Sequence, residues 1–294
     1  MHQHSKNPKN IASSLGCASM RQSGLAKMVG FGAILAVLSL NQSLHAAVIG
    51  KWLFDEGTGL TATDQSGHSL NGTVSNTALW TSDHPTGATH DYAGNHALSF
   101  DQNNPQQVTV GSSSLLNAAA LSFQFWYKDS RLAGGGDSST YSYIAGRTDA
   151  WVIERVWRSA TDISLRLYLK RSDATGSWFS TTYSIIQSVS LSQDELWHNI
   201  AFTCTDNGNF TVYFDGSVYT NTQNNISLAK TSTSDITFGK FSANNTRRCT
   251  FEMDEFAIYD EALTAAQVLA NIPEPASLAL LLAGGLLVLR RKRG

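Results

Sequence analysis

The sequence predicts an all-β antiparallel sandwich that lies between an N-terminal signal helix and a short C-terminal transmembrane helix. Three observations support this prediction. Short β-branched and aromatic runs alternate with Gly, Asn, Asp and Ser turns through the middle of the chain, and helical periodicity is almost absent there. Both ends are basic and apolar. Residues 47–275 carry 13 of the 21 basic residues and all 23 acidic residues, a net charge of −10. This asymmetry indicates that the two ends interact with the membrane and that a polar, soluble body lies between them.

Residues 1–46 have the order of a secretory signal peptide. A basic region without acidic residues precedes an apolar run at residues 28–40, and small residues follow at Ala46 and Ala47. The apolar run has 13 residues, whereas a membrane-spanning helix needs about 20. We therefore expect export and cleavage, whether translation begins at Met1 or at Met20.

Residues 47–271 are enough for one large sandwich or barrel domain. Turn signals such as Asn71-Gly72 and Asp215-Gly216 separate its β-rich runs. Many short strands with this punctuation favour an antiparallel sandwich. Examples of the expected strands are residues 49–54, 97–100, 107–110, 122–127, 163–170, 198–204, 209–214 and 250–259.

Two local elements are predicted in detail. A hairpin is expected around Asn207-Gly208, because apolar residues alternate on both sides of a dipeptide that supplies the positive φ angles of a tight turn. One short helix is expected at residues 264–270, because Thr264 and Gln267 have the spacing of a capping box.

Residues 272–294 form a three-part tail. It contains an apolar run at residues 276–289, preceded by Pro273, Glu274 and Pro275 and followed by Arg290, Arg291, Lys292 and Arg293. This order resembles the PEP-CTERM sorting signal. The resemblance implies a Gram-negative bacterium, usually one that produces exopolysaccharide, and removal of the tail by an exosortase. The basic cluster is expected on the cytoplasmic side, and a plain tail anchor is the alternative.

Several stretches of the body occur in an order typical of one domain family. They are residues 48–57, 64–73, 97–101, 121–126, 197–201, 212–216 and 253–267, including Asp64-Gln-Ser-Gly67, Trp197-His-Asn-Ile-Ala201 and Met253-Asp-Glu-Phe256. Together they resemble a LamG-like domain that extends from about Ala47 to Ala270. The resemblance implies a concanavalin A-like jelly roll, in which two curved antiparallel sheets pack face to face.

Two cysteines, Cys204 and Cys249, remain after removal of the signal peptide. The compartment outside the inner membrane is oxidising, so a disulfide is allowed. The bond would close a loop of roughly 45 residues and stabilise the fold by about 3–4 kcal/mol. We expect this disulfide, and two buried thiols are the alternative.

The resemblance to concanavalin A-like domains also implies a structural calcium ion that joins the first strands to the last. Asp254 would supply its side chain, while Asp55, Asp64 and Gly67 would supply side-chain or carbonyl oxygens, the ligands that Ca²⁺ prefers. The alternative is a hydrogen-bonded carboxylate that organises a turn.

No catalytic residues are expected. Glu252 and Asp254 partly match the Glu-x-Asp-x-(x)-Glu pattern of laminarinase-like hydrolases, and retaining hydrolysis needs two carboxyl groups about 5–5.5 Å apart. Alternate residues of a regular strand face one side, so Glu255 is expected on the opposite face from this pair. Phe256 and Ala257 occupy the positions at which a third carboxylate should lie.

Aromatic residues and arginines gather in the central third of the chain and predict a ligand-binding groove. Aromatic faces and polar donors suit sugar rings, although half or more of these aromatics are expected in the core. The net charge of −10 excludes nucleic acid as a partner. The candidate contact residues are Tyr141, Trp151, Trp157 and Trp178, and the interleaved basic residues are Arg147, Arg155, Arg158 and Arg166.

The sequence therefore predicts an exported, non-catalytic binding or structural protein of the cell surface or extracellular matrix, transiently anchored in the inner membrane by its C-terminal helix. The expected partners are an exosortase and an extracellular polysaccharide, and calcium is the expected cofactor. One alternative is a polysaccharide-active enzyme, a glycoside hydrolase or lyase, on the same fold. The other is a purely structural adhesion module.

Overall fold

The computed structural model describes residues 46–75, 79–85, 96–104, 106–129, 141–174, 184–192, 194–229, 231–240 and 247–272. The predicted signal peptide up to residue 45, the predicted sorting tail from Pro273 onward, and Trp178 lie outside this part of the chain. No helix within it is long and apolar enough to span a membrane.

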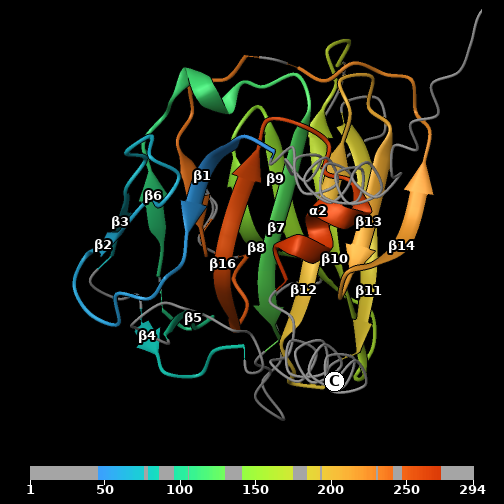
Figure 1. Ribbon diagram of the computed structural model, residues 1–294. Coiled ribbons are helices and arrows are strands. Elements are labelled where there is room, and N and C mark those ends of the chain that lie inside the picture. The colour runs from blue at the N-terminus through green and yellow to red at the C-terminus, as the bar shows by residue number, and fades with distance from the viewer. Residues whose placement is uncertain are drawn as a thin grey trace, which may run out of the picture. The chain divides into compact units, whose positions relative to one another are not determined.

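Two eight-stranded antiparallel sheets pack face to face (Figure 1). The front sheet has the order β14 (Ser217–Thr222), β13 (Phe210–Phe214), β12 (His198–Cys204), β7 (Leu121–Lys128), β16 (Phe251–Tyr259), β5 (Ala97–Phe100) and β4 (Leu79–Thr81), and β1 (Val48–Trp52) also pairs with β16. The rear sheet has the order β11 (Ser184–Ser192), β10 (Asp162–Lys170), β9 (Trp151–Trp157), β8 (Tyr141–Arg147), β15 (Ile236–Phe238), β6 (Val108–Val110), β3 (Gly72–Val74) and β2 (Thr61–Ala62). The predicted all-β antiparallel sandwich is confirmed.

The core lies between the two sheets and is centred on Phe256. Its ring lies 5.3 Å from that of Phe125 in the front sheet and 5.0 Å from that of Phe238 in the rear sheet, measured between centroids. Trp52 and Trp151 pack around it and are at most 1% exposed. Side chains alternate between the two faces of each strand, so the inward set fills the space between the sheets.

A β-bulge in β16 changes the direction of Glu255. Asp254 pairs with Trp126 and Ala257 pairs with Gln124, which leaves two residues of β16 opposite one of β7. Phe256 takes the inward position with no exposure, and Glu255 adopts a positive φ of 51° and is half-buried. Its charge contributes, after burial, to raising the pKa of its sequence neighbour Asp254. The prediction of regular strand alternation through Glu255 is wrong, because the bulge adds a residue there.

The short helix and the hairpin form where the sequence predicts them. In α2 (Ala265–Ala270) the Thr264 hydroxyl accepts from Gln267 N and the Gln267 side chain accepts from Thr264 N, which is a complete capping box. The helix covers part of the outer face of the front sheet (Figure 1), where Gln124 Nε2 donates to Val268 O at 3.0 Å. The hairpin joins β12 to β13, with Cys204 opposite Phe210. A 3-10 turn, η1 (Ser114–Leu116), precedes β7.

The predicted disulfide is wrong, because Cys204 and Cys249 lie at opposite ends of β7. Both cysteines are buried, and neither is in a disulfide. Cys204 pairs with Leu121 at the start of β7, whereas Cys249 lies just before β16, whose Glu252 pairs with Lys128 at the end of β7. Eight residues of strand place these ends roughly 23 Å apart, and a disulfide needs Cα atoms within about 7 Å. The alternative of two buried thiols holds.

Candidate functional site

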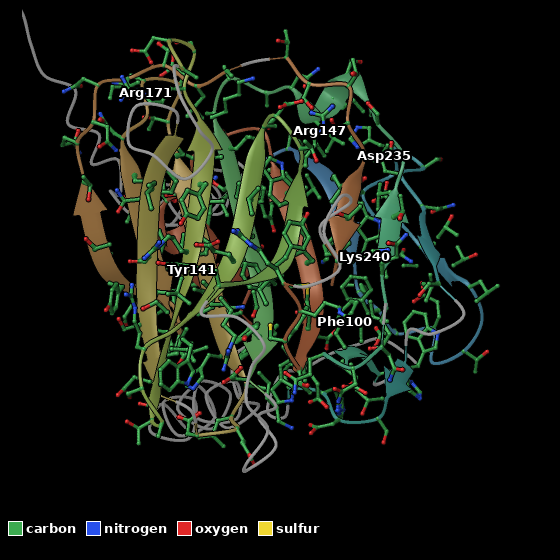
Figure 2. All side chains as sticks on the ribbon, turned by 180° about the vertical axis from the view of Figure 1, so that it is seen from behind. Phe100, Tyr141, Arg147, Arg171, Asp235 and Lys240 are labelled. Atoms are coloured by element: carbon green, nitrogen blue, oxygen red, sulfur yellow. The ribbon has the colours of Figure 1, made fainter. Side chains whose placement is uncertain are left out.

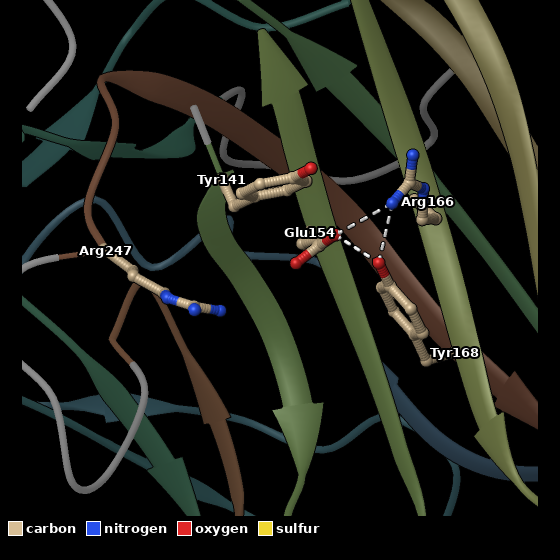
Figure 3. Close-up of a pocket in the computed structure, with 5 residues that line it drawn as sticks. All are labelled: Tyr141, Glu154, Arg166, Tyr168 and Arg247. Carbon is tan, nitrogen blue, oxygen red and sulfur yellow. Dashed lines mark hydrogen bonds and ion pairs between the residues drawn. The ribbon is translucent and has the colours of Figure 1, made fainter. Parts of the chain in front are cut away.

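A pocket of about 220 Å³ lies on the outer face of the rear sheet. Tyr141 of β8, Glu154 of β9, and Arg166 and Tyr168 of β10 line it together with Arg247, which precedes β16 (Figure 3). The register explains the gathering, because Glu154 pairs with Arg166 across β9 and β10. Tyr168 lies two residues beyond Arg166 and therefore shares its face of the sheet.

Three side chains form a hydrogen-bonded group at the base of the pocket. The Tyr168 hydroxyl donates to Glu154 Oε1 at 2.5 Å and accepts from Arg166 Nη1 at 2.8 Å. Arg166 Nη1 also lies 3.6 Å from Glu154 Oε1. Burial raises the pKa of Glu154, and the Tyr168 hydrogen bond and the charges of Arg166, Arg247 and Arg158 oppose this shift. The carboxyl group is thus fixed as a hydrogen-bonding group that is only 3% exposed.

Aromatic rings flank the Arg166 guanidinium. Its central carbon lies 5.9 Å from the Tyr141 ring centroid and 5.8 Å from that of Tyr168, within the range of a cation–π contact. Tyr141 is 41% exposed, and it lies over the middle of the rear sheet (Figure 2). The pocket therefore offers an accessible aromatic ring next to oriented charged groups.

The four residues predicted to contact a ligand lie in different parts of the structure. Tyr141 lines the pocket, and its contact with a ligand stays a prediction. Trp151 is 1% exposed and packs against Phe123 with ring centroids 4.6 Å apart, so it belongs to the core and the prediction of a ligand contact there is wrong. Trp157 ends β9, is 37% exposed and is not among the residues that line the pocket. Trp178 lies outside the described residues.

Glu154 and Arg247 line the pocket but were not predicted from the sequence, whereas Tyr168 belongs to the aromatic cluster in the central third of the chain. Alternation of Arg166 and Tyr168 in one strand was an available signal that the two share a face. No sequence signal shows that Arg247 lies near them, because it follows Arg166 by about 80 residues. Only the folding of the sandwich brings its segment beside β8. Arg247 O accepts from Tyr143 N at 2.9 Å, which fixes this segment beside β8.

The carboxylates that partly match a hydrolase pattern lie elsewhere, on β16. Glu252 Oε2 lies 3.1 Å from Lys128 Nζ, which also pairs with Asp83. Burial, together with the charges of Glu255 and Asp55, raises the pKa of Asp254 to about 9. Glu252 thus has an ion-pair partner in the sheet, and Asp254 is protonated near neutral pH.

The residues predicted to bind calcium do not fit as one ligand set. Asp64 Oδ1 accepts from Lys51 N at 3.0 Å and Ser66 N at 2.9 Å, while Oδ2 accepts from the Ser66 hydroxyl at 2.7 Å and Leu70 N at 2.9 Å. Burial opposes their effect, but these bonds hold the pKa of Asp64 below its usual value. Asp64 therefore fits the alternative of a carboxylate that organises a turn. Over the described residues, no group of three or more His, Cys, Asp or Glu is arranged to hold a metal ion.

The two-sheet jelly roll, with a polar and aromatic pocket on one sheet, defines a lectin-type sandwich protein. Residues 101–269 match the family model described as "Concanavalin A-like lectin/glucanases superfamily". The match covers more than half of the chain, and the chain belongs to this superfamily. The predicted concanavalin A-like fold is thereby confirmed.

Solved structures share the fold at low sequence identity. The binding domain of Paraclostridial Mosquitocidal Protein 1 is 16% identical with a TM-score of 0.52, over 76% of this chain and 51% of that chain. The Botulinum neurotoxin serotype G binding domain is 16% identical with a TM-score of 0.54, over 75% of this chain and 49% of that chain. Domain 4 of AbnA, an extracellular arabinanase from Geobacillus stearothermophilus, is 18% identical with a TM-score of 0.50, over 76% of this chain and 97% of that chain.

These similarities show the fold alone. This chain spans about half the length of the two toxin binding domains. The AbnA domain was solved in complex with arabinotriose. No curated protein sequence matches the chain.

Proposed function

We propose that this protein is an exported, non-catalytic carbohydrate-binding protein of the cell surface or extracellular matrix, with an extracellular polysaccharide as its ligand. The observation that carries this proposal is the pocket on the rear sheet, in which the exposed ring of Tyr141 lies beside the hydrogen-bonded Glu154 and Arg166. A sugar ring can pack its apolar face on the tyrosine, and its hydroxyl groups can donate to the carboxylate and accept from the guanidinium.

Two further points support binding rather than catalysis. The AbnA domain, solved with a bound trisaccharide, has this fold over nearly its whole length, although its low identity transfers no residue role. Among the described residues, Glu154 is the one carboxylate that lines the pocket. Glycoside hydrolysis by the common mechanisms uses two.

The test is binding to a glycan array, followed by titration of the best ligand with wild type and with Tyr141→Ala. We expect Tyr141→Ala to weaken binding about tenfold, the loss of a contact worth about 1.4 kcal/mol. Tyr219→Ala is the matched control, because Tyr219 is 47% exposed on β14 of the other sheet. Equal losses in both variants would remove the pocket from the proposal. A folded protein that binds no glycan would favour a purely structural module.

The same preparations test the enzymatic alternative. Incubation with the bound polysaccharide is expected to release no reducing sugar. Release that disappears in Glu252→Gln would instead establish a hydrolase on β16.

Export and sorting rest on the two ends of the chain, which lie outside the described residues. We propose that the N-terminal segment is removed after export and that an exosortase removes the tail near Pro273-Glu274-Pro275. Mass spectrometry of the protein recovered from the cell surface is expected to find both segments missing. An intact chain recovered from the cytosol would overturn the proposal.

A structural calcium ion remains a prediction, and its candidate carboxylate ligands are now Asp254 and Asp55. Two carboxyl groups that raise each other's cost of ionisation would be relieved by a cation, and the remaining ligands of a six- to eight-coordinate ion would be backbone oxygens and water. Bound calcium is expected to raise the melting temperature, and a chelator to lower it by a few degrees. Asp254→Asn is expected to remove this response. A melting temperature that a chelator leaves unchanged would reject the ion.

A further inference from the structure

We propose that the rear-sheet pocket selects an anionic saccharide, one that carries a carboxylate or a sulfate, and that Arg247 is the residue that contacts the anionic group. This inference rests on the proposed carbohydrate binding and specifies the class of ligand.

The local charge of the pocket is positive, in contrast to the rest of the protein body. The body of the protein has a net charge of −10 over residues 47–275, which by itself disfavours an acidic ligand. The pocket reverses this sign, because two arginines and one carboxylate line it. Arg158 adds a third positive charge that acts on Glu154. At physiological salt, charges more than about 8 Å apart are largely screened from each other. A ligand in the pocket therefore responds mainly to the nearby arginines and Glu154.

The two arginines of the pocket have different surroundings. Arg166 contacts Tyr168 and Glu154, and its central carbon lies 5.9 Å from the Tyr141 ring centroid and 5.8 Å from that of Tyr168. Figure 3 shows Arg247 on the other side of Glu154, extending from its own segment toward the pocket. An anionic group would be repelled by Glu154, which favours a position on the Arg247 side.

Hydrogen bonds to backbone carbonyls hold the main chain around Arg247. Arg247 O accepts from Tyr143 N at 2.9 Å, and the neighbouring Arg248 O accepts from the Ser142 hydroxyl at 3.3 Å. A guanidinium on an anchored backbone can present two parallel N–H groups to a carboxylate or sulfate. Substitution of the Arg247 side chain leaves these two hydrogen bonds to the main chain in place.

The resulting arrangement assigns one role to each side chain. Arg247 contacts the anionic group, Tyr141 packs against the sugar ring, and Glu154 accepts from a hydroxyl group of the same or the next sugar unit. The pocket volume of about 220 Å³ is that of roughly seven waters at about 30 Å³ each, enough for one sugar unit with the rest of the chain outside.

The experiment is isothermal titration of the full chain with three oligosaccharide series of equal length: oligogalacturonate, neutral galactan oligosaccharide, and its sulfated form. We expect at least one anionic series to bind about tenfold or more tightly than the neutral one, and to weaken as salt increases. Arg247→Gln is expected to lower affinity for that series about tenfold and to change neutral binding little.

Arg171→Gln is the matched control, because it removes the same charge at the end of the rear sheet, away from Tyr141 (Figure 2). We expect this variant to bind like wild type. Tighter binding of the uronate or of the sulfated series identifies the anion and supports the proposal in either case.

The two proposals fail differently. If the neutral series binds as tightly as both anionic series, and Arg247→Gln weakens none of them selectively, the preference for anions is wrong and carbohydrate binding stands. If equal losses occur in Arg247→Gln and Arg171→Gln, the effect is general charge and the role of Arg247 is wrong. If no series and no glycan on the array binds to the folded protein, the proposed function itself fails.

Discussion

Arg147→Met is expected to lower the free energy of unfolding by about 3–5 kcal/mol. Arg147 has no exposed surface. Its guanidinium donates to Leu116 O at 2.9 Å, Asn117 Oδ1 at 2.7 Å, Ser113 O at 3.3 Å, Ser232 O at 2.6 Å and Ser234 O at 2.9 Å. Methionine fills a similar length but donates to none of these oxygens, and a buried acceptor without a partner costs about 1–3 kcal/mol.

The reason for the large effect is that one side chain joins two loops. It connects the η1 turn to the segment before β15, at the end of β8 in the rear sheet. Burial lowers the pKa of Arg147, and the charge of Asp235 partly offsets this shift. The five hydrogen bonds compensate the cost of removing this cation from water. Removing the cation recovers its desolvation energy, which keeps the net loss below the sum of the bonds.

Chemical denaturation measures this prediction. Arg147→Lys is expected to fall between wild type and Arg147→Met, because lysine keeps the charge but has three donors and no planar fork. Arg171→Met is the control, because Arg171 is a partly exposed arginine paired with the exposed Asp173, and it is expected to change stability by less than about 1 kcal/mol. Arg147→Met within about 1 kcal/mol of wild type would contradict the structural role.

Asp129→Asn is expected to destabilise the protein by about 3–5 kcal/mol, because it leaves a buried cation without its counter-charge. Arg155 is 1% exposed, and its Nε and Nη2 donate to Asp129 Oδ1 at 2.8 Å and Oδ2 at 3.1 Å. Tyr127 also donates to Asp129 Oδ1 at 3.1 Å. In the wild type these neighbours raise the pKa of Arg155 against the opposing effect of burial. Arginine stays protonated in proteins, so the guanidinium keeps its charge after Asp129 is replaced.

The double variant Asp129→Leu, Arg155→Met separates charge from packing. Replacing both members of a buried pair by apolar residues is often neutral or stabilising, so the double variant is expected to recover much of the loss. Chemical denaturation of both proteins gives the comparison. If the double variant is as unstable as Asp129→Asn, the loss comes from packing, and the interpretation as an unpaired charge is wrong.

The pocket shows how the sheet register assembles a site from distant residues. Glu154, Arg166 and Tyr168 meet because β9 and β10 pair with no shift of register. Tyr141 joins them across β8, and Arg247 is added by a segment that hydrogen-bonds to β8. Arg155 and Arg147, which the sequence placed in the same aromatic and basic cluster, face the interior and stabilise the sandwich instead.

The sequence alone determined the class of fold, the hairpin at Asn207-Gly208 and the capped helix after Thr264. These features depend on side-chain periodicity, turn residues and capping pairs, which act over a few neighbouring residues. Eight of the sixteen strands in the described residues lie outside the ranges named as examples from the sequence: β2, β3, β4, β8, β9, β11, β14 and β15.

Only the tertiary structure decided which of the residues singled out in the sequence lie close together. Cys204 and Cys249 both lie beside strands, but the register of β7 separates them. Glu255 departs from the regular alternation because a bulge adds one residue to β16. Trp151 is a core residue and Tyr141 a pocket residue, although both occur in one aromatic stretch. The physical reason is that a one-residue change of register or strand phase moves a side chain to the other face of a sheet, and pairing between distant strands, which fixes that phase, leaves no local mark in the sequence.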